Sequence, residues 1–154
     1  MDEMIPASGG GRILAIDLGE KRVGLAVSDP LGLTAQGLPT LARRSKRRDL
    51  NYLKSLARRY EVSLIVVGNP LHMDGSEGRQ SEKARAFAAE LQEHLGLEVR
   101  LWDERLTSVE ASRVLREAGA GASARREATD RMAAVLLLDH FLETQRAAGA
   151  RNEP

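Results

Sequence analysis

The chain of 154 residues has no cysteine and few aromatic residues, and each of these absences excludes a class of protein. Without cysteine it can form neither a disulfide nor a thiolate zinc site, and it offers no thiol nucleophile. Because aromatic residues make up only 3% of the chain, the core must be built from Leu, Val, Ile and Ala. No apolar run reaches about 18 residues, so we expect no transmembrane helix. The acidic, Gly-rich start does not resemble a signal peptide, which predicts a cytoplasmic protein with no membrane partner.

The length predicts one globular domain and is too short for a two-domain kinase or ATPase. Residues 1–10 and 147–154 show no apolar periodicity and contain polar residues and glycine. We expect both segments to be flexible tails. The single domain is then expected to span residues 11–146.

The net charge of +1 conceals a strongly basic segment. Residues 42–59 carry eight basic residues and one acid, Asp49, a local charge of +7. Such a segment can bind a polyanion even in a nearly neutral protein. Most of its arginines lie on a helix expected over 47–60, where a solvated helix face is the simpler interpretation. Three basic residues that precede that helix are the better candidates for phosphate contacts: Arg43, Arg44 and Lys46. Such contacts position nucleic acid without reading its sequence.

Short apolar runs alternate with helical patterns along the chain. The patterns predict strands at 13–18, 23–28, 33–40, 63–68 and 97–102, and helices at 47–60, 80–95, 107–115 and 130–146. The first two strands are joined by only four residues, so they must form an antiparallel hairpin. We therefore predict an α/β fold with a mixed five-stranded sheet, antiparallel in its first three strands, and helices on both faces. Two polar, Gly-containing segments, 72–80 and 119–127, are the expected mobile loops.

Three acidic residues stand out against these elements. Asp17 lies in an apolar strand, where a carboxylate is costly unless a positive group compensates it; the alternative is an acid at the strand end bonded to turn amides. Glu104 follows the last strand, where an ion pair with Arg105 is the alternative. Asp130 begins the last helix, where an acid in the first turn contributes about 0.3–1 kcal/mol. Each alternative explains one residue, but none explains the set.

The predicted topology can bring the three carboxylates together. Strands one and four of such a sheet are usually central neighbours, so Asp17 and Glu104 can converge at one edge of the sheet. The last helix can place Asp130 at the same point. Carboxylates without cysteine or suitably spaced histidines form a hard-oxygen site that suits Mg²⁺ or Mn²⁺. Two such ions about 3.5–4 Å apart could activate water and stabilise a leaving oxygen. Beside a basic surface, this site predicts phosphodiester hydrolysis.

Four segments carry a family resemblance: AIDLGEKRVGLAVSD (15–29), VVGNPLHMDGSEG (66–78), DERLTS (103–108) and TDRMAAVLLL (129–138). In this order they resemble the YqgF family of Holliday-junction-resolvase-like nucleases with an RNase H-like fold, also called pre-16S rRNA nucleases. The family's acidic triad falls on Asp17, Glu104 and Asp130. The resemblance implies that these three residues are catalytic metal ligands, with Asp17 bridging two ions and each of the others completing one coordination shell.

Further residues are expected to bind substrate. Lys21 and Arg22 match the family's basic hairpin turn, for which a solvated turn is the alternative. We also count Arg105, next to Glu104, among the substrate-binding residues.

The resemblance implies an Mg²⁺- or Mn²⁺-dependent endonuclease that matures the 5′ end of pre-16S rRNA. Structured RNA is the expected partner, and ribosomal precursor particles are a second one. One alternative is a Holliday junction resolvase acting on branched DNA, and another is a non-catalytic RNA-binding ribosome-assembly factor. The run ILAIDLG also resembles the phosphate-binding strand of actin-like ATPases and sugar kinases, which need a second domain that this chain is too short to supply. The sequence leaves open RNA or DNA, Mg²⁺ or Mn²⁺, and monomer or homodimer.

Overall fold

The computed structural model of the protein describes residues 11–106 and 123–152. Within them, five strands form one sheet in the order β3-β2-β1-β4-β5. The strands are β1 (Arg12–Leu18), β2 (Arg22–Ser28), β3 (Ala35–Ala42), β4 (Val62–Asn69) and β5 (Glu98–Asp103). The helices are α2 (Lys46–Arg59), α3 (Arg79–Leu95) and α5 (Ser123–Asn152), with the short 3₁₀ helix η1 (Glu104–Leu106).

The sheet is mixed, as the sequence predicts. β1 pairs antiparallel with β2, and β2 pairs antiparallel with β3. β1 is parallel to β4, and β4 is parallel to β5. Since parallel strands must be joined by crossovers, α2 and α3 each return the chain to the start of the next strand. The carboxyl ends of β1, β4 and β5 therefore lie at one edge of the sheet.

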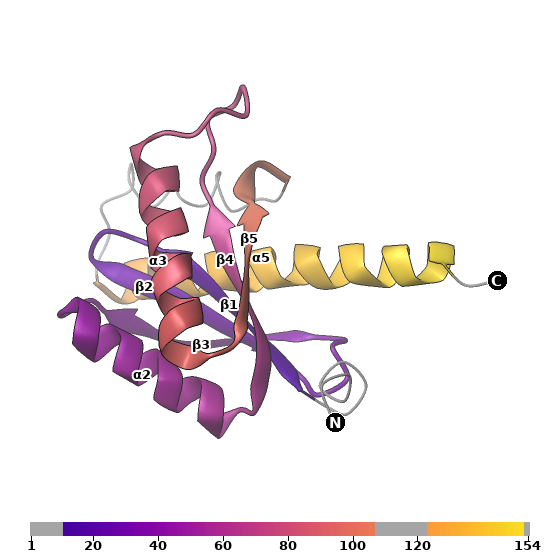
Figure 1. Cartoon of the computed structure of the whole chain (residues 1–154), viewed down its shortest axis with the longest axis horizontal. Helices are drawn as coiled ribbons and strands as arrows, with labels where there is room; N and C mark the ends of the chain where they lie inside the picture. Colours follow the sequence, from indigo (N-terminus) through magenta and orange to yellow (C-terminus); the bar gives the residue numbers. More distant parts are fainter. Residues whose placement is uncertain (1–10, 107–122, 153–154) are drawn as a thin grey trace.

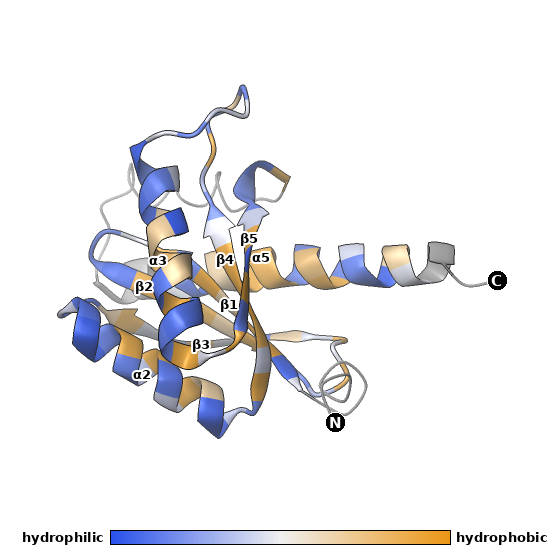
Figure 2. Cartoon of the chain, in the orientation of Figure 1, coloured by the Kyte–Doolittle hydropathy of each residue, from blue (hydrophilic) through white to orange (hydrophobic). Residues whose placement is uncertain are grey.

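Helices cover both faces of the sheet, which confirms the predicted α/β class. α5 packs across β1, β2 and β3 on one face, while α2 and α3 lie on the other (Figure 1). Successive residues of β1 alternate between the two cores. Leu14 and Ile16 belong to the core with α2 and α3, whereas Ala15 belongs to the core with α5. The visible surfaces of α2 and α3 carry many hydrophilic residues, and apolar residues lie on the strands behind them (Figure 2).

Local sequence determines where α2 and α3 begin and end. The Ser45 side chain caps α2 by accepting a hydrogen bond of 3.2 Å from the Arg48 backbone N–H. α3 ends at Gly96, whose left-handed conformation (φ +72°) favours glycine. The ends of these helices and of four of the strands lie within one residue of the predicted ends. β3 begins and ends two residues later than predicted.

The last helix is longer than predicted at both ends. The sequence analysis begins it at Asp130 and places a loop over 119–127, but α5 begins at Ser123. It also continues to Asn152, into the segment expected to be a tail. Ala and Arg, which are strong helix formers, dominate both extensions, and a single glycine costs only about 1 kcal/mol relative to alanine. Asp130 thus lies inside the helix, so the explanation that it is a first-turn acid is wrong.

Other predictions fall outside the described residues. These are the predicted helix at 107–115 and the first part of the 119–127 loop. In the part of the chain that the structure describes, no helix is long and apolar enough to cross a membrane.

Candidate active site

Asp17 lies near the carboxyl end of the central strand β1 and is buried, with 2% of its surface exposed. Because strand residues alternate between faces, it lies on the same face as Ala15, which packs against α5. In the antiparallel register Asp17 pairs with Gly24 of β2. Burial of a carboxylate requires compensating polar or charged neighbours, so the residues around Asp17 decide what it can do.

Asp130 reaches this position because Gly24 has no side chain. A Cβ atom at Gly24 would overlap the backbone carbonyl oxygen of Asp130 and lie 3.6 Å from the Cβ atom of Ala134. Glycine in a strand permits such a close approach, and α5 therefore sits directly on β2 here. Asp130 is 5% exposed. Its Oδ2 atom accepts a 2.6 Å hydrogen bond from Nε of Arg22, which forms an ion pair.

Glu104 reaches the same edge from the other side of β1. Gly68 of β4 follows Val67, which pairs with Ile16 in the parallel register, so Gly68 is the next neighbour of Asp17. A Cβ atom at Gly68 would overlap the Glu104 carboxylate and lie 3.1 Å from the Cγ and Cδ atoms of that side chain. Glu104 begins η1 directly after β5 and is 2% exposed.

The three acidic residues thus lie in a row over adjacent strands, with Asp130 over β2, Asp17 on β1 and Glu104 over β4. Neighbouring strands are about 4.7–4.9 Å apart, so the negative charges are concentrated at one edge of the sheet. Arg22 compensates the charge at one end of the row. Within residues 11–106 and 123–152, no group of three or more His, Cys, Asp or Glu side chains is close enough together to hold a metal ion. The three carboxylates lie at the same edge of the sheet, but their positions in this structure do not form a complete metal-binding site.

Four of the six predicted substrate-binding residues line one groove. It has a volume of about 700 Å³ and lies between the β1–β2 turn, the start of α2 and the middle of α3. The four are Lys21, Arg43, Arg44 and Lys46. Lys83 adds a fifth basic side chain, while Glu20, Asp49 and Glu90 are acidic, so the net charge of the lining is +2. We call this the basic groove.

The fold holds three of these basic side chains in place. Nη1 of Arg43 donates to the Gly19 carbonyl oxygen at 2.8 Å. Arg44 forms an ion pair with Asp49 at 3.5 Å, and Nζ of Lys46 pairs with Glu90 at 2.7 Å. Lys21 and Lys83 form no ion pair with any residue of the described segments, so their charges are available to a ligand. Both side chains line the basic groove, Lys21 from the β1–β2 turn and Lys83 from α3.

The β1–β2 turn joins the basic groove to the carboxylate row. Lys21 lines the groove, whereas the next residue, Arg22, bonds to Asp130 on the other side of the turn. A polyanion that crosses this turn would therefore contact both regions.

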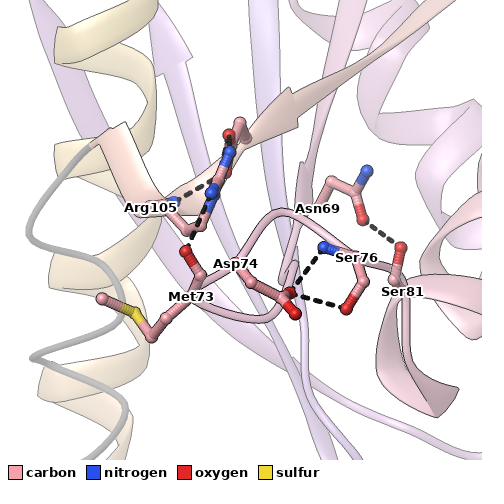
Figure 3. A network of polar contacts seen from close by, with 7 residues as sticks. Asn69, Met73, Asp74, Ser76, Ser81 and Arg105 are labelled. Atoms are coloured by element: carbon pink, nitrogen blue, oxygen red, sulfur yellow. Dashed lines mark hydrogen bonds and ion pairs between the residues drawn. The ribbon is translucent and has the colours of Figure 1, made fainter.

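Arg105 lies apart from the basic groove. Its Nε and Nη2 atoms donate to the Asp103 carboxylate, with a shortest distance of 2.7 Å, and its Nη1 atom donates to the Met73 carbonyl oxygen at 3.1 Å. The hydrogen bond from the Arg105 side chain is the main reason why the pKa of Asp103 is below its usual value. Arg105 thus ties the segment after β4 to the end of β5 (Figure 3).

The sequence analysis missed the two glycines that shape the site. Gly24 and Gly68 each lie in an apolar run that forms a strand. An isolated glycine in a strand is a signal for a close backbone approach, so this pattern could have identified both positions. Lys83 was missed because a single lysine on a helix has no sequence pattern that distinguishes it from a solvated residue.

Comparison with known proteins gives the same family along nearly the whole chain. The family model described as "RuvX: Holliday junction resolvase" matches residues 11–144. The chain is 54% identical over 149 residues to a "Putative pre-16S rRNA nuclease" of Koribacter versatilis, covering 97% of this chain and 96% of that protein. It is 51% identical over 132 residues to a protein of the same name from Moorella thermoacetica, covering 86% and 94%.

A solved structure agrees with this fold. RuvC of T. thermophilus, in complex with a Holliday junction substrate, superposes with a TM-score of 0.55 at 15% identity and covers 88% of this chain and 96% of that one. This likeness confirms the RNase H-like fold that the sequence predicts. The sheet, the match over residues 11–144 and the relatives at more than half identity agree, and the chain belongs to the RuvX family of nucleases, the family that the sequence analysis calls YqgF.

Proposed function

We propose that this protein is a metal-dependent endonuclease that hydrolyses phosphodiester bonds of structured RNA and matures the 5′ end of pre-16S rRNA. The observation that carries the proposal is the row of three buried carboxylates at one edge of the sheet, with a basic groove across the β1–β2 turn from it. The names of the relatives from Koribacter versatilis and Moorella thermoacetica favour precursor rRNA as substrate. Ribosomal precursor particles in the cytoplasm are the corresponding partner.

The donor atoms of the site fit hard divalent cations. Asp17, Glu104 and Asp130 supply only carboxylate oxygens, which are the ligands that Mg²⁺ and Mn²⁺ prefer. Asp17, at the centre of the row, would hold the ions together with Glu104 and Asp130. When bound, such ions supply Lewis-acid activation of a water molecule and of the phosphate. Since Arg22 bonds to one oxygen of Asp130, this arginine would have to release that oxygen for a cation.

The protein's own side chains would position the substrate. Lys21 and Lys83 of the basic groove would bind backbone phosphates, and Arg43, Arg44 and Lys46 would add charge while keeping the groove in shape. Such contacts position a nucleic acid without selecting its sequence. Arg22, once released from Asp130, would be close enough to the row to meet the same phosphate that the carboxylates act on. Arg105 would act from the other end of the row, beside Glu104.

Holliday junction resolution is the second candidate function. The description of the family and the fold of the T. thermophilus resolvase both favour it. A resolvase cuts two strands symmetrically, so this function predicts a twofold dimer.

The test is a cleavage assay on two substrates. The full chain is incubated with a structured precursor of 16S rRNA and with a four-way DNA junction, each with Mg²⁺, Mn²⁺ or EDTA. Asp17→Asn is the test variant. Asp139→Asn, at an exposed position of α5 away from the row, is the matched control. We expect the RNA to be cut by the wild-type chain and the control, and not by Asp17→Asn or in EDTA.

The other outcomes separate the alternatives. Symmetric nicking of the junction alone would favour the resolvase. If neither substrate is cut while wild-type and Asp17→Asn proteins bind the RNA equally well, the protein is an RNA-binding assembly factor and the proposal fails.

A further inference from the structure

A second cavity lies at the far end of the carboxylate row, beyond Glu104. It has a volume of about 410 Å³ and is enclosed by the segment 70–73, the start of α3 and Glu104 itself. Glu104 also lies over Gly68, the neighbour of Asp17. The same side chain thus links the row to the cavity, so a ligand in the cavity would be next to whatever the row holds.

The wall of this cavity is held by hydrogen bonds (Figure 3). The Ser81 hydroxyl donates to the buried Asn69 side chain at 2.6 Å, which ties α3 to the end of β4. Arg105 donates to the Met73 carbonyl oxygen. The Asp74 carboxylate accepts from the backbone N–H and the hydroxyl of Ser76, at 2.9 and 2.7 Å. A preformed wall reduces the entropy that is lost when a ligand binds.

One flat side chain in this wall lies against the backbone of Gly78. His72 lines the cavity, and a Cβ atom at Gly78 would overlap its imidazole ring. The ring therefore lies directly against the backbone at the start of α3, where only glycine leaves room for it. Pro70 and Leu71 supply apolar surface beside it. A flat ring and apolar neighbours provide the surface on which an unstacked nucleobase packs.

Hydrogen-bond donors lie on the α3 side of the cavity, opposite the acidic Glu104. Arg79 and Gln80 line it from the first turn of α3. The residue that caps this helix is Gly78, which makes no side-chain cap hydrogen bond. The first backbone N–H groups of a helix have no partner within the helix. A donor-rich rim favours a base edge that presents acceptors, such as the N7 and O6 atoms of guanine.

We propose that this cavity, defined by Pro70, Leu71, His72, Arg79, Gln80 and Glu104, binds the base of the nucleotide next to the cleaved phosphate, with a preference for guanine. Its volume is at the small end of the range of about 300–1,000 Å³ for ligand pockets, which suits one nucleoside and excludes a duplex. The assignment rests on the proposed nuclease function for its biological meaning. It adds base selection to a site whose phosphate contacts cannot read sequence.

The first experiment measures binding without cleavage. The full chain, labelled with ¹⁵N, is titrated at millimolar concentration with GMP, AMP, CMP and UMP, and with ribose 5-phosphate as a probe of phosphate binding alone. We expect GMP to shift the amide signals of residues 71–73 and 78–80 most strongly, and ribose 5-phosphate to shift them little. Equal shifts from ribose 5-phosphate, or no shifts from any nucleotide, would overturn the proposal.

Three variants locate the base. His72→Ala removes the flat ring, and Gly78→Ala displaces it while leaving its chemistry unchanged; each should weaken GMP binding about tenfold, within the range for loss of one base-stacking contact. His94→Ala is the control, because His94 is half-buried on α3 and contacts Asn51 outside the cavity. Unchanged GMP affinity in both test variants would show that the base binds elsewhere.

A second readout separates this proposal from the nuclease proposal. Four precursor RNAs that differ only in the base next to the cleavage site are cut by wild-type and His72→Ala proteins, and their kcat/KM values are compared. We expect the wild-type preference to be lost in His72→Ala. If the wild-type chain cuts RNA but His72→Ala keeps its base preference, the cavity proposal fails and the nuclease stands. If GMP binds in the cavity but no RNA is cut, the nuclease proposal fails and the cavity stands.

Discussion

The substitution Gly68→Ala tests whether the absence of a side chain on β4 positions Glu104. The new Cβ atom would overlap the carboxylate of Glu104 and lie 3.1 Å from its Cγ and Cδ atoms. Ordinary van der Waals contact between such atoms begins near 3.5 Å, so the Glu104 side chain must move. Glu104 is 2% exposed but lines the cavity next to α3, so either its side chain moves into that cavity or the strand or η1 shifts.

Two magnitudes follow from this geometry. Overpacking of a filled site costs about 1–3 kcal/mol, so the free energy of unfolding should fall by that amount while the protein still folds. A displacement of about 1 Å at a catalytic group can reduce the rate about 100-fold. We therefore expect cleavage of the precursor RNA to fall about 100-fold at a temperature where the variant remains folded.

The assay compares kcat/KM for RNA cleavage with urea unfolding measured by circular dichroism. The matched control is Gly149→Ala, since a Cβ atom at Gly149 meets no atom within 4 Å and the change should stabilise α5 by up to about 1 kcal/mol. Shortening the displaced side chain in the double variant Gly68→Ala/Glu104→Asp should restore part of the lost stability. Wild-type activity in Gly68→Ala would refute the reasoning, because Glu104 would then either not depend on Gly68 or not take part in the reaction.

Three further predictions concern charges. Arg22→Gln removes the arginine that bonds to Asp130 Oδ2, so the affinity for Mn²⁺ measured by calorimetry should increase about tenfold, which corresponds to about 1.4 kcal/mol. The control is Arg100→Gln, at an exposed position of β5. Unchanged affinity in Arg22→Gln would show that arginine and metal do not compete. Asp103→Asn removes a carboxylate whose pKa is lowered mainly by the hydrogen bond from Arg105. The pKa of Asp103 is lower in the folded than in the unfolded state, so its contribution to the free energy of unfolding is complete at neutral pH and is lost as the pH falls through the folded value. Urea unfolding should therefore show a difference in stability between wild type and variant at pH 7 that narrows below pH about 4. A difference that is constant with pH would contradict this. Lys21→Gln and Lys83→Gln should each reduce the slope of log K for RNA binding against log salt by about 0.7, whereas Lys54→Gln, on α2 outside the basic groove, should not.

Much of the fold was accessible from the sequence because local patterns determine it. The β-branched run at 63–68 predicts β4 within one residue, and the apolar spacing of 80–95 together with Gly96 predicts α3 and its end. The start of α5 was not accessible in this way. The segment 119–129 contains glycine as well as Ala and Arg, so the same composition fits both a loop and the start of a helix.

For the candidate site, the sequence identifies residues but not their arrangement. Asp17 stands out because it interrupts an apolar strand, and its position on the central strand follows from the topology. What the sequence cannot show is that Gly24 and Gly68 leave space for Asp130 and Glu104, since these contacts join residues more than 30 positions apart. Nor does any pattern predict that Arg22 bonds to Asp130, 108 positions away, or that Arg105 bonds to the Met73 carbonyl group.

The position of Asp130 on the last helix has a consequence for the protein's synthesis. Asp17 leaves the ribosome well before Asp130, which lies on the last helix that the structure describes. Until α5 docks on β1, β2 and β3, the row lacks one of its three acids and the apolar face of the sheet is uncovered. Under the proposed function, a nascent chain without α5 would not yet cleave RNA, because its catalytic row would be incomplete. The uncovered apolar face would also make such a chain prone to aggregate.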